Sequence, residues 1–143
     1  MQIEIATSPF DPWAEVSRHE RTLPKGRCGA AAVFVGTMRD FNEGDEVRGM
    51  TLEHYPGMTE RNLESIAAGT MDRLGLDDVL IVHRVGPLEP GDPIVLVAAW
   101  SAHRAAAFDG CREIMEHLKS KAPFWKKETL ARGTRWVERN TPG

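Results

Sequence analysis

The chain has 143 residues, of which 41% are hydrophobic and 27% charged, and its formal net charge at pH 7 is -3. This length suits one compact domain, 1–143, and the composition excludes a disordered chain and a general nucleic-acid-binding protein. No apolar run approaches the roughly 20 residues of a membrane-spanning helix, and the first residues lack the pattern of a signal peptide, so we expect a cytoplasmic protein.

The N-terminal part predicts a strand, a short helix and a second strand. Polar and apolar residues alternate over residues 2–6, which is typical of a half-buried strand. Asp11 followed by Pro12 combines a capping side chain with proline at the first helical position, so we expect a helix to about residue 21. The apolar run 29–36 predicts a buried strand, with Arg39 just past its end.

The next segment predicts a loop, a strand and the first long helix. Residues 40–46 are polar and contain glycine, so we expect a loop that leads to a strand over 47–54. Apolar residues then recur at helical spacing until Gly75 supplies a stop: Leu63, Ile66, Ala67, Met71 and Leu74.

Two further strands are expected over residues 79–82 and 94–98. The proline- and glycine-rich residues 86–92 predict the turn between them, and an antiparallel pair is the simplest connection. Ser101 then stands where it can cap a second long helix.

That helix should end near Lys121, because Pro123 disfavours helical geometry at the residue before it. Its apolar face, at spacings of three and four, is expected to comprise Phe108, Cys111, Met115 and Leu118. Residues 124–138 indicate a final hairpin. Because strands and helices do not alternate strictly, the predicted class is α+β, with helices packed on a largely antiparallel sheet.

The cysteines and histidines favour neither metal nor cofactor binding. Cys28 and Cys111 are far apart and lack a CxxC or Cys/His spacing, so we expect two reduced thiols, with Cys111 in the core. The histidines lack the spacing of metal ligands. We therefore expect no metal and no cofactor.

Cationic side chains gather near the C-terminal end. From Lys119 to Arg135 there are six basic residues and one acid, Glu128, so this stretch carries +5 and the rest of the chain carries -8. If the bend at Pro123 folds the segment back, Lys119 and Lys126 can face one cavity, where repulsion and burial would lower a lysine pKa toward the range of an acid, base or nucleophile. The alternative is a solvated helix end whose cations complement the helix dipole, with the aromatic residues 124 and 125 in the core.

Another candidate anion site is Ser101-Ala-His103-Arg104, where a strand ends and a helix begins. Free N–H groups and the positive end of the helix dipole favour an anion there, and His103 and Arg104 would add donors. Alternatively, Arg104 pairs with a surface acid and His103 packs against the sheet edge. Arg39, at a strand exit, is a third candidate.

Several segments together resemble the large subunit of molybdopterin synthase. The resemblance runs in order from about Ile3 to Glu138 and rests on Phe34-Val-Gly36 with Arg39, Thr51-Leu-Glu-His-Tyr-Pro-Gly-Met-Thr59, His83-Arg-Val-Gly86, Ser101-Ala-His-Arg104 and Lys119-Ser-Lys-Ala-Pro-Phe-Trp-Lys126. It implies an α/β hammerhead fold with an additional small antiparallel sheet.

The resemblance also implies an activity and its partners. In that family, a small ubiquitin-like sulfur carrier inserts its C-terminal Gly-Gly thiocarboxylate into a pocket of the large subunit. Two sulfurs pass in successive steps to cyclic pyranopterin monophosphate and form the dithiolene of molybdopterin, so this sulfurtransferase needs no catalytic cysteine of its own. A central homodimer with one carrier at each far end makes a heterotetramer.

Carried over by matching motif, the principal catalytic residues would be Lys119 and Lys126. The pterin phosphate or the incoming tail would bind to Arg39, His103 and Arg104, and the pocket would also be lined by Thr37, Met38, Lys127 and Glu128. A second subunit of the dimer could supply Arg or His to its neighbour's pocket. Two other functions would use the same cations: a non-catalytic module that senses a phosphorylated metabolite or anchors a carrier tail, and a phosphohydrolase or acyl transferase that needs no carrier.

Overall fold

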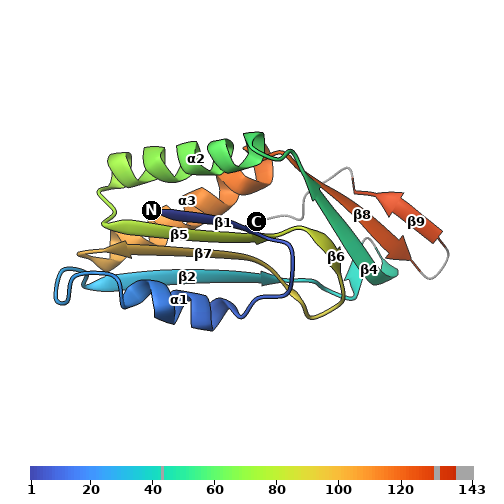
Figure 1. The fold of residues 1–143 in the computed structure, drawn as a ribbon, viewed down its shortest axis with the longest axis horizontal. Helices are drawn as coiled ribbons and strands as arrows, with labels where there is room; N and C mark the ends of the chain where they lie inside the picture. The colour runs from blue at the N-terminus through green and yellow to red at the C-terminus, as the bar shows by residue number, and fades with distance from the viewer. Residues whose placement is uncertain (43, 131–132, 138–143) are drawn as a thin grey trace.

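The computed structural model describes residues 1–42, 44–130 and 133–137. These residues form helices and two sheets (Figure 1). The helices are α1 (Pro12–Glu20), α2 (Met58–Leu74) and α3 (Arg104–Lys121). The strands are β1 (Gln2–Ala6), β2 (Ala30–Thr37), β3 (Phe41–Asn42), β4 (Asp45–His54), β5 (Asp78–Arg84), β6 (Gly86–Leu88), β7 (Pro93–Ser101), β8 (Phe124–Leu130) and β9 (Gly133–Trp136).

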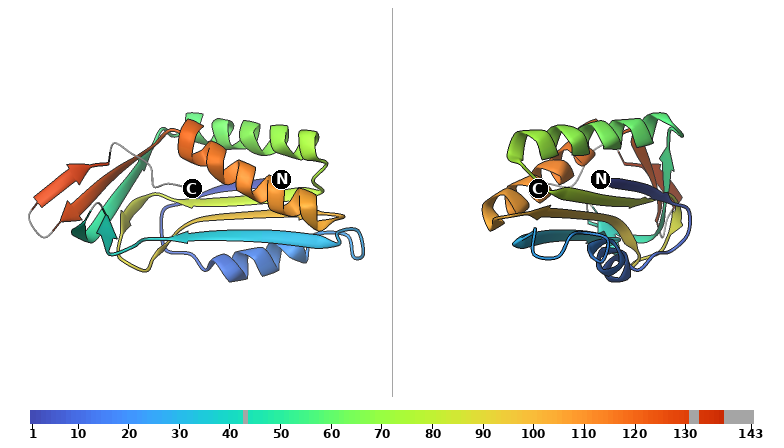
Figure 2. Two further views of the ribbon diagram at one scale, coloured as in Figure 1. Left: turned by 180° about the vertical axis from the view of Figure 1, so that it is seen from behind. Right: turned by 60° about the vertical axis from the view of Figure 1, so that its left-hand side comes forward.

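The first sheet has four strands in the order β1-β5-β7-β2. β1 runs parallel to β5, whereas β7 is antiparallel to both β5 and β2. α1 covers one face and α2 and α3 cover the other (Figures 1 and 2). Both faces of β5 are therefore covered, which explains why all seven of its residues are buried.

Two apolar clusters fill the spaces on either side of this sheet. The cluster beneath α2 and α3 includes Leu63, Ile81, Val97 and Ile114, all fully buried. The cluster beneath α1 includes Leu80, Leu96 and Trp100, each at most 1% exposed. Adjacent residues of β5 thus enter opposite cores, as the two-residue period of a strand requires.

The second sheet is small, antiparallel and attached to one end of the first. Its main path is β3-β4-β8-β9, and β6 pairs with β4. β4 and β8 pair from Val47↔Leu130 to His54↔Phe124. A third apolar cluster lies at this sheet: Met38, Val47, Met50, Leu52, Leu88 and Leu130. The additional small sheet expected from the resemblance is confirmed, and so is the α+β class.

Local sequence signals account for several element ends. The Asp11 carboxylate accepts hydrogen bonds from the Trp13 and Ala14 backbone N–H groups at 3.0 and 3.3 Å, so it caps α1 as expected. Gly75 ends α2 in the left-handed conformation, with φ of 68°. α3 ends at Lys121, and Ala122 has extended geometry, as the following proline predicts. The final hairpin is confirmed for β8 and β9, while position 138 lies outside the described residues.

Four expectations were wrong in detail. Residues 40–46 are not simply a loop, because β3 and the start of β4 pair there. The turn over 86–92 contains β6. Ser101 is the last residue of β7 and pairs with Ala30, so the N-cap of α3 is His103. Phe108 is 66% exposed, because the buried face of α3 follows Ala107, Cys111, Ile114, Met115 and Leu118.

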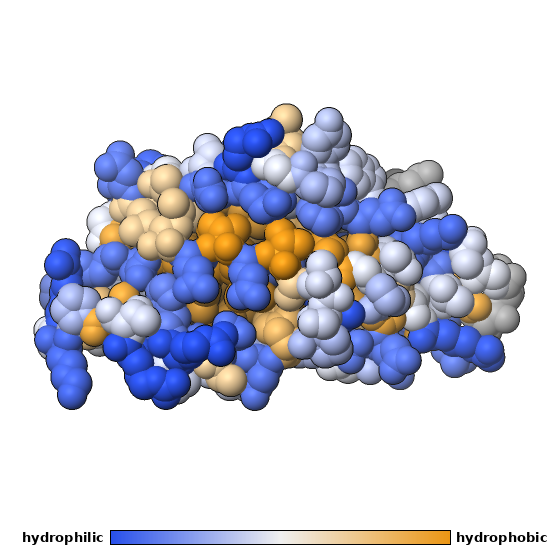
Figure 3. Space-filling view, in the orientation of Figure 1, coloured by the Kyte–Doolittle hydropathy of each residue, from blue (hydrophilic) through white to orange (hydrophobic). Residues whose placement is uncertain are grey.

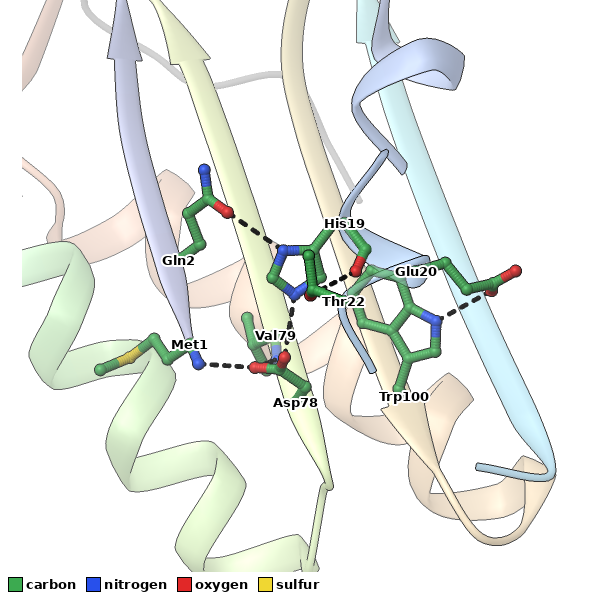
Figure 4. A network of polar contacts seen from close by, with 8 residues as sticks. All are labelled: Met1, Gln2, His19, Glu20, Thr22, Asp78, Val79 and Trp100. Atoms are coloured by element: carbon green, nitrogen blue, oxygen red, sulfur yellow. Dashed lines mark hydrogen bonds and ion pairs between the residues drawn. The ribbon is translucent and has the colours of Figure 1, made fainter. Parts of the chain in front are cut away.

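A buried polar network fastens α1 to β5 and β1 (Figure 4). His19 Nε2 lies 2.9 Å from Asp78 Oδ2, and His19 Nδ1 lies 3.1 Å from Gln2 Oε1. The Met1 amino group lies 2.6 Å from Asp78 Oδ1. Burial opposes ionisation of Asp78, but hydrogen bonds from that amino group, His19 and the Val79 N–H outweigh it and lower its pKa. The network thus satisfies a carboxylate that would otherwise destabilise the core.

The surface is mostly polar on the face seen in Figure 3, where an apolar band crosses the centre between α2 and the sheet. The half-buried residues Ile3 and Ile5 of β1 pack against the core cluster beneath α2 and α3.

None of the described helices is both long and apolar enough to span a bilayer.

Candidate active site

A cavity of about 280 Å³ opens where the two sheets meet. Its walls come from the ends of β2 and β5, the last turn of α3 and the start of β8. The polar side chains among its lining residues are Thr37, Arg39, Asn42, His83, Lys119, Lys126 and Glu128. Apolar lining residues include Phe34, Met38, Met50, Met115 and Phe124. Cations from three separate stretches of the chain therefore converge on one hollow.

The bend after α3 brings Lys119 and Lys126 together. Lys119 lies in the last turn of α3, and the chain reverses through Ala122 and Pro123 before β8 begins. Along β8, even-numbered side chains face inward, and Lys126 is therefore half-buried between Phe124 and Glu128. Burial, followed by repulsion from Lys119, lowers the pKa of Lys126 to about 8.

Arg39 enters the cavity from the segment that follows β2. Its guanidinium carbon lies 5.0 Å from the centroid of the Phe41 ring, within the range of a cation–π contact. The neighbouring Met38 is 5% exposed, and its backbone N–H donates to the Asp92 carbonyl at 2.9 Å. These contacts fix the backbone from which Arg39 extends.

Glu128 is the acidic member of the cavity wall and is 4% exposed. Its Oε1 accepts from Asn42 Nδ2 at 2.9 Å and from Arg135 Nε at 3.2 Å. Arg135 also donates to Asp45 Oδ2 at 2.8 Å and to the Asn42 carbonyl at 2.9 Å. The carboxylate is thus held by polar contacts that join β3, β4, β8 and β9.

Comparison with known proteins shows the family to which this chain belongs. The model of the MoaE protein family matches residues 5–121, which is most of the chain. The chain belongs to the MoaE family. It is 52% identical over 139 residues to the molybdopterin synthase catalytic subunit of Pseudomonas aeruginosa, covering 96% of this chain and 91% of that protein.

Solved structures of MoaE-family proteins have the same fold. The MoaE protein from Burkholderia ambifaria superposes with a TM-score of 0.82 at 51% identity, over 99% of this chain and 92% of that one. The molybdopterin synthase structure from Staphylococcus aureus gives a TM-score of 0.85 at 30% identity, over 95% of this chain and 96% of that one. The recognition made from the sequence motifs is therefore confirmed.

Three of the expected site residues of this MoaE-family chain lie outside the cavity. His103 and Arg104 are exposed at the start of α3, about 24 Å along the helix from Lys119 at 1.5 Å per residue. Lys127 points to the outer face of the second sheet, where its Nζ lies 5.5 Å from the centroid of the Trp136 ring. The other six, namely Thr37, Met38, Arg39, Lys119, Lys126 and Glu128, line the cavity together.

The motif analysis missed His83, which forms part of the cavity wall. It is 8% exposed, and its ring stacks on Phe124 with centroids 3.8 Å apart and an interplanar angle of 13°. Burial, reinforced by the charges of Lys126 and Lys119, lowers the pKa of His83 to about 4. The available signal was its position at the end of a buried strand, within the His83-Arg-Val-Gly86 motif.

Neither cysteine is poised for nucleophilic chemistry. Burial raises the pKa of Cys111 to about 11, and its thiol lies 3.5 Å from the Val97 carbonyl oxygen in the core, as expected. The pKa of Cys28 is also raised, by burial and by Asp77. The described residues contain no group of three or more His, Cys, Asp or Glu side chains that could hold a metal ion.

Proposed function

We propose that this chain is the catalytic subunit of a molybdopterin synthase. It transfers sulfur from the C-terminal thiocarboxylate of a small ubiquitin-like carrier to cyclic pyranopterin monophosphate, which becomes molybdopterin. The observation that carries the proposal is the meeting of Arg39, Lys119 and Lys126 in one cavity. A thiocarboxylate and a phosphate repel each other, and a cationic hollow is what brings two such anions together. The names of relatives at about 50% identity support the same conclusion.

The two lysines have distinct proposed roles. Release of the carrier requires its acyl C–S bond to break, with the oxygen of water taking the place of sulfur and leaving a carboxylate on the carrier. An ammonium group on Lys119 can stabilise the oxyanion of the tetrahedral intermediate. The pKa of Lys126, about 8, is close to neutral pH, so this amine can donate or accept the proton that moves when water replaces sulfur on the carrier.

A second copy of the chain would explain the positions of His103 and Arg104. β2 is an edge strand of the first sheet, and Phe34 and Phe108 are exposed on β2 and α3. Ala30, at one end of β2, pairs with Ser101 near the start of α3, whereas Thr37, at the other end, lines the cavity. If two copies pair antiparallel along β2, the start of each α3 approaches the cavity of its neighbour. We therefore propose a homodimer that carries one carrier on each far side.

Mixing two inactive variants tests this shared site. Arg104→Ala and Lys119→Ala should each be inactive alone, because each removes one half of every complete site. A mixed dimer still contains one pocket with both residues intact, so subunit exchange should restore about a quarter of wild-type activity. A mixture that stays inactive, although mixed dimers form, would show that the two residues act within one subunit. An Arg104→Ala variant that is active alone would show that Arg104 is not needed.

The catalytic role itself is tested with purified chain, thiocarboxylated carrier and pterin phosphate. Lys119→Ala should still bind the carrier but lose roughly 100-fold or more in dithiolene formation, and the exposed Lys121→Ala should not. Unchanged product from Lys119→Ala would favour the non-catalytic binding module. Turnover of the pterin phosphate without carrier would favour a phosphohydrolase or acyl transferase. The single domain and the cytoplasmic location remain part of this proposal.

A further inference from the structure

The surroundings of His83 in the cavity wall determine which of its two ring nitrogens carries the hydrogen. Its Nδ1 lies 2.9 Å from the Arg84 backbone carbonyl oxygen. A carbonyl oxygen can only accept, so Nδ1 carries the hydrogen and Nε2 keeps its lone pair. The stack on Phe124 fixes the plane of the ring. The ring nitrogen that remains available to the cavity is therefore an acceptor.

The neutral state of this ring is maintained by the site itself. His83 is buried, and Lys126 and Lys119 disfavour a further positive charge beside them, which is consistent with its pKa of about 4. At neutral pH the imidazole therefore cannot become a second donor, and its acceptor character is constant.

The other cavity residues make such an acceptor useful. Arg39, Lys119 and protonated Lys126 can only donate hydrogen bonds. The Glu128 oxygen Oε1 already accepts from Asn42 and Arg135. These cations suit the anionic parts of the two reactants, but they cannot recognise a group that itself carries N–H donors. A pterin ring carries such donors, in its amino substituent and its ring N–H groups.

We propose that His83 is a substrate-orienting residue whose Nε2 accepts a hydrogen bond from an N–H group of the pterin ring. This inference rests on the proposed function, because it assumes a pterin phosphate in the cavity. The cations hold the phosphate and the thiocarboxylate, while His83 selects a heterocycle with a donor edge and sets its orientation. A site that hydrogen-bonds its ligand discriminates against analogues without the matching group, since its own buried polar atom is then left without a partner.

Binding measurements on two ligands test the proposal. The first is cyclic pyranopterin monophosphate, and the second is phenyl phosphate, an aromatic anion without ring N–H donors. His83→Phe keeps an aromatic ring against Phe124 but removes the acceptor. It should weaken pterin phosphate binding about tenfold or more and leave phenyl phosphate binding unchanged. His83→Gln, whose amide oxygen can accept, should recover part of the loss, and His117→Gln on α3 should change neither affinity.

The possible results distinguish an orienting role of His83 from a merely structural one, and failure of this role from failure of the proposed function. If His83→Phe binds the pterin phosphate as wild type does, or loses both ligands equally, the orienting role is overturned. In that case the proposed function still stands if Lys119→Ala abolishes product formation. If the wild-type chain with its carrier does not convert the pterin phosphate at all, the proposed function fails and this inference fails with it.

Discussion

Lys119 in the last turn of α3 lies close enough to Lys126 in β8 to repel its charge, and burial together with this repulsion lowers the pKa of Lys126 to about 8. The pair exists because Pro123 ends the helix and β8 returns along the cavity. A lysine whose pKa lies near neutral pH is a usual component of proton-transfer and nucleophilic sites. The relationship between the two amines can be measured directly.

Removing the charge of Lys119 should raise the pKa of Lys126. In Lys119→Met the repulsion is gone while burial remains, so we expect a value between about 8 and the ordinary 10.5. NMR titration of isotope-labelled lysine side chains would report it. Lys121→Met, which removes an exposed charge of the same helix end, should leave the Lys126 titration where it is. An unchanged pKa in Lys119→Met would mean that the two amines are not coupled.

The buried His83 should make stability depend on pH in mildly acidic solution. Its pKa is about 4 in the folded protein and 6.5 ordinarily, so between these values the unfolded chain binds a proton that the folded chain does not. The free energy of unfolding should therefore rise with pH from 4 to 6.5, by about 3 kcal/mol in total. Denaturant titrations at several pH values should show this slope in the wild type and lose it in His83→Gln. Asp78 is unchanged in both proteins and contributes equally to both. Equal pH dependence of the free energy of unfolding in the two proteins would therefore contradict the assignment to His83.

Two helical glycines should respond oppositely to alanine. A Cβ on Gly110 of α3 would lie 2.7 Å from Leu76 Cδ1, whereas one on Gly69 of α2 would meet nothing within 4 Å. Gly69→Ala should stabilise by about 0.5–1 kcal/mol through helix propensity, and Gly110→Ala should destabilise by about 1–3 kcal/mol through overpacking. In a Leu76→Ala background the Gly110→Ala penalty should disappear. Thermal or denaturant unfolding would measure this penalty. If Gly110→Ala still destabilises the Leu76→Ala protein, contact with Leu76 is not the cause.

Arg135 should stabilise the second sheet beyond what an ordinary surface arginine contributes. It contacts Glu128, Asp45 and the Asn42 carbonyl, and it is 24% exposed at its side chain. Arg135→Met should cost about 1–3 kcal/mol, because it leaves the buried Glu128 carboxylate with one fewer donor. Arg48→Met, at an exposed position of β4, should stay within about 0.5 kcal/mol of wild type. Equal unfolding curves for the two variants would contradict the role of Arg135.

Sequence patterns predicted the elements that local chemistry dictates. Asp11, Gly75 and Pro123 each act on their own neighbours, so the ends of α1, α2 and α3 could be expected from the sequence. The pairing of Lys119 with Lys126 could also be foreseen, because they lie only seven positions apart with one bend between them. Helical periodicity placed Phe108 on the buried face, but Ala107 lies there instead, since the packing of α3 against the sheet and α2 sets its rotation.

The rest of the site depends on contacts between distant segments. His83 is neutral because strand burial, Phe124 and the lysines surround it, and none of these is visible in the residues next to it. The contacts of Glu128 with Asn42 likewise join residues 86 positions apart. The placement of His103 and Arg104 away from the cavity follows from the length of α3, and the proposed dimer is what would bring them to it.

The most direct test of the cationic cavity is a structure of this chain bound to its carrier, read for the position of the carrier's last glycine. We predict that the terminal carbonyl carbon lies inside the cavity, with its oxygen or sulfur about 3 Å from the Nζ atom of Lys119 or Lys126. A carrier whose tail ends on another surface, with both lysines left facing solvent, would contradict it.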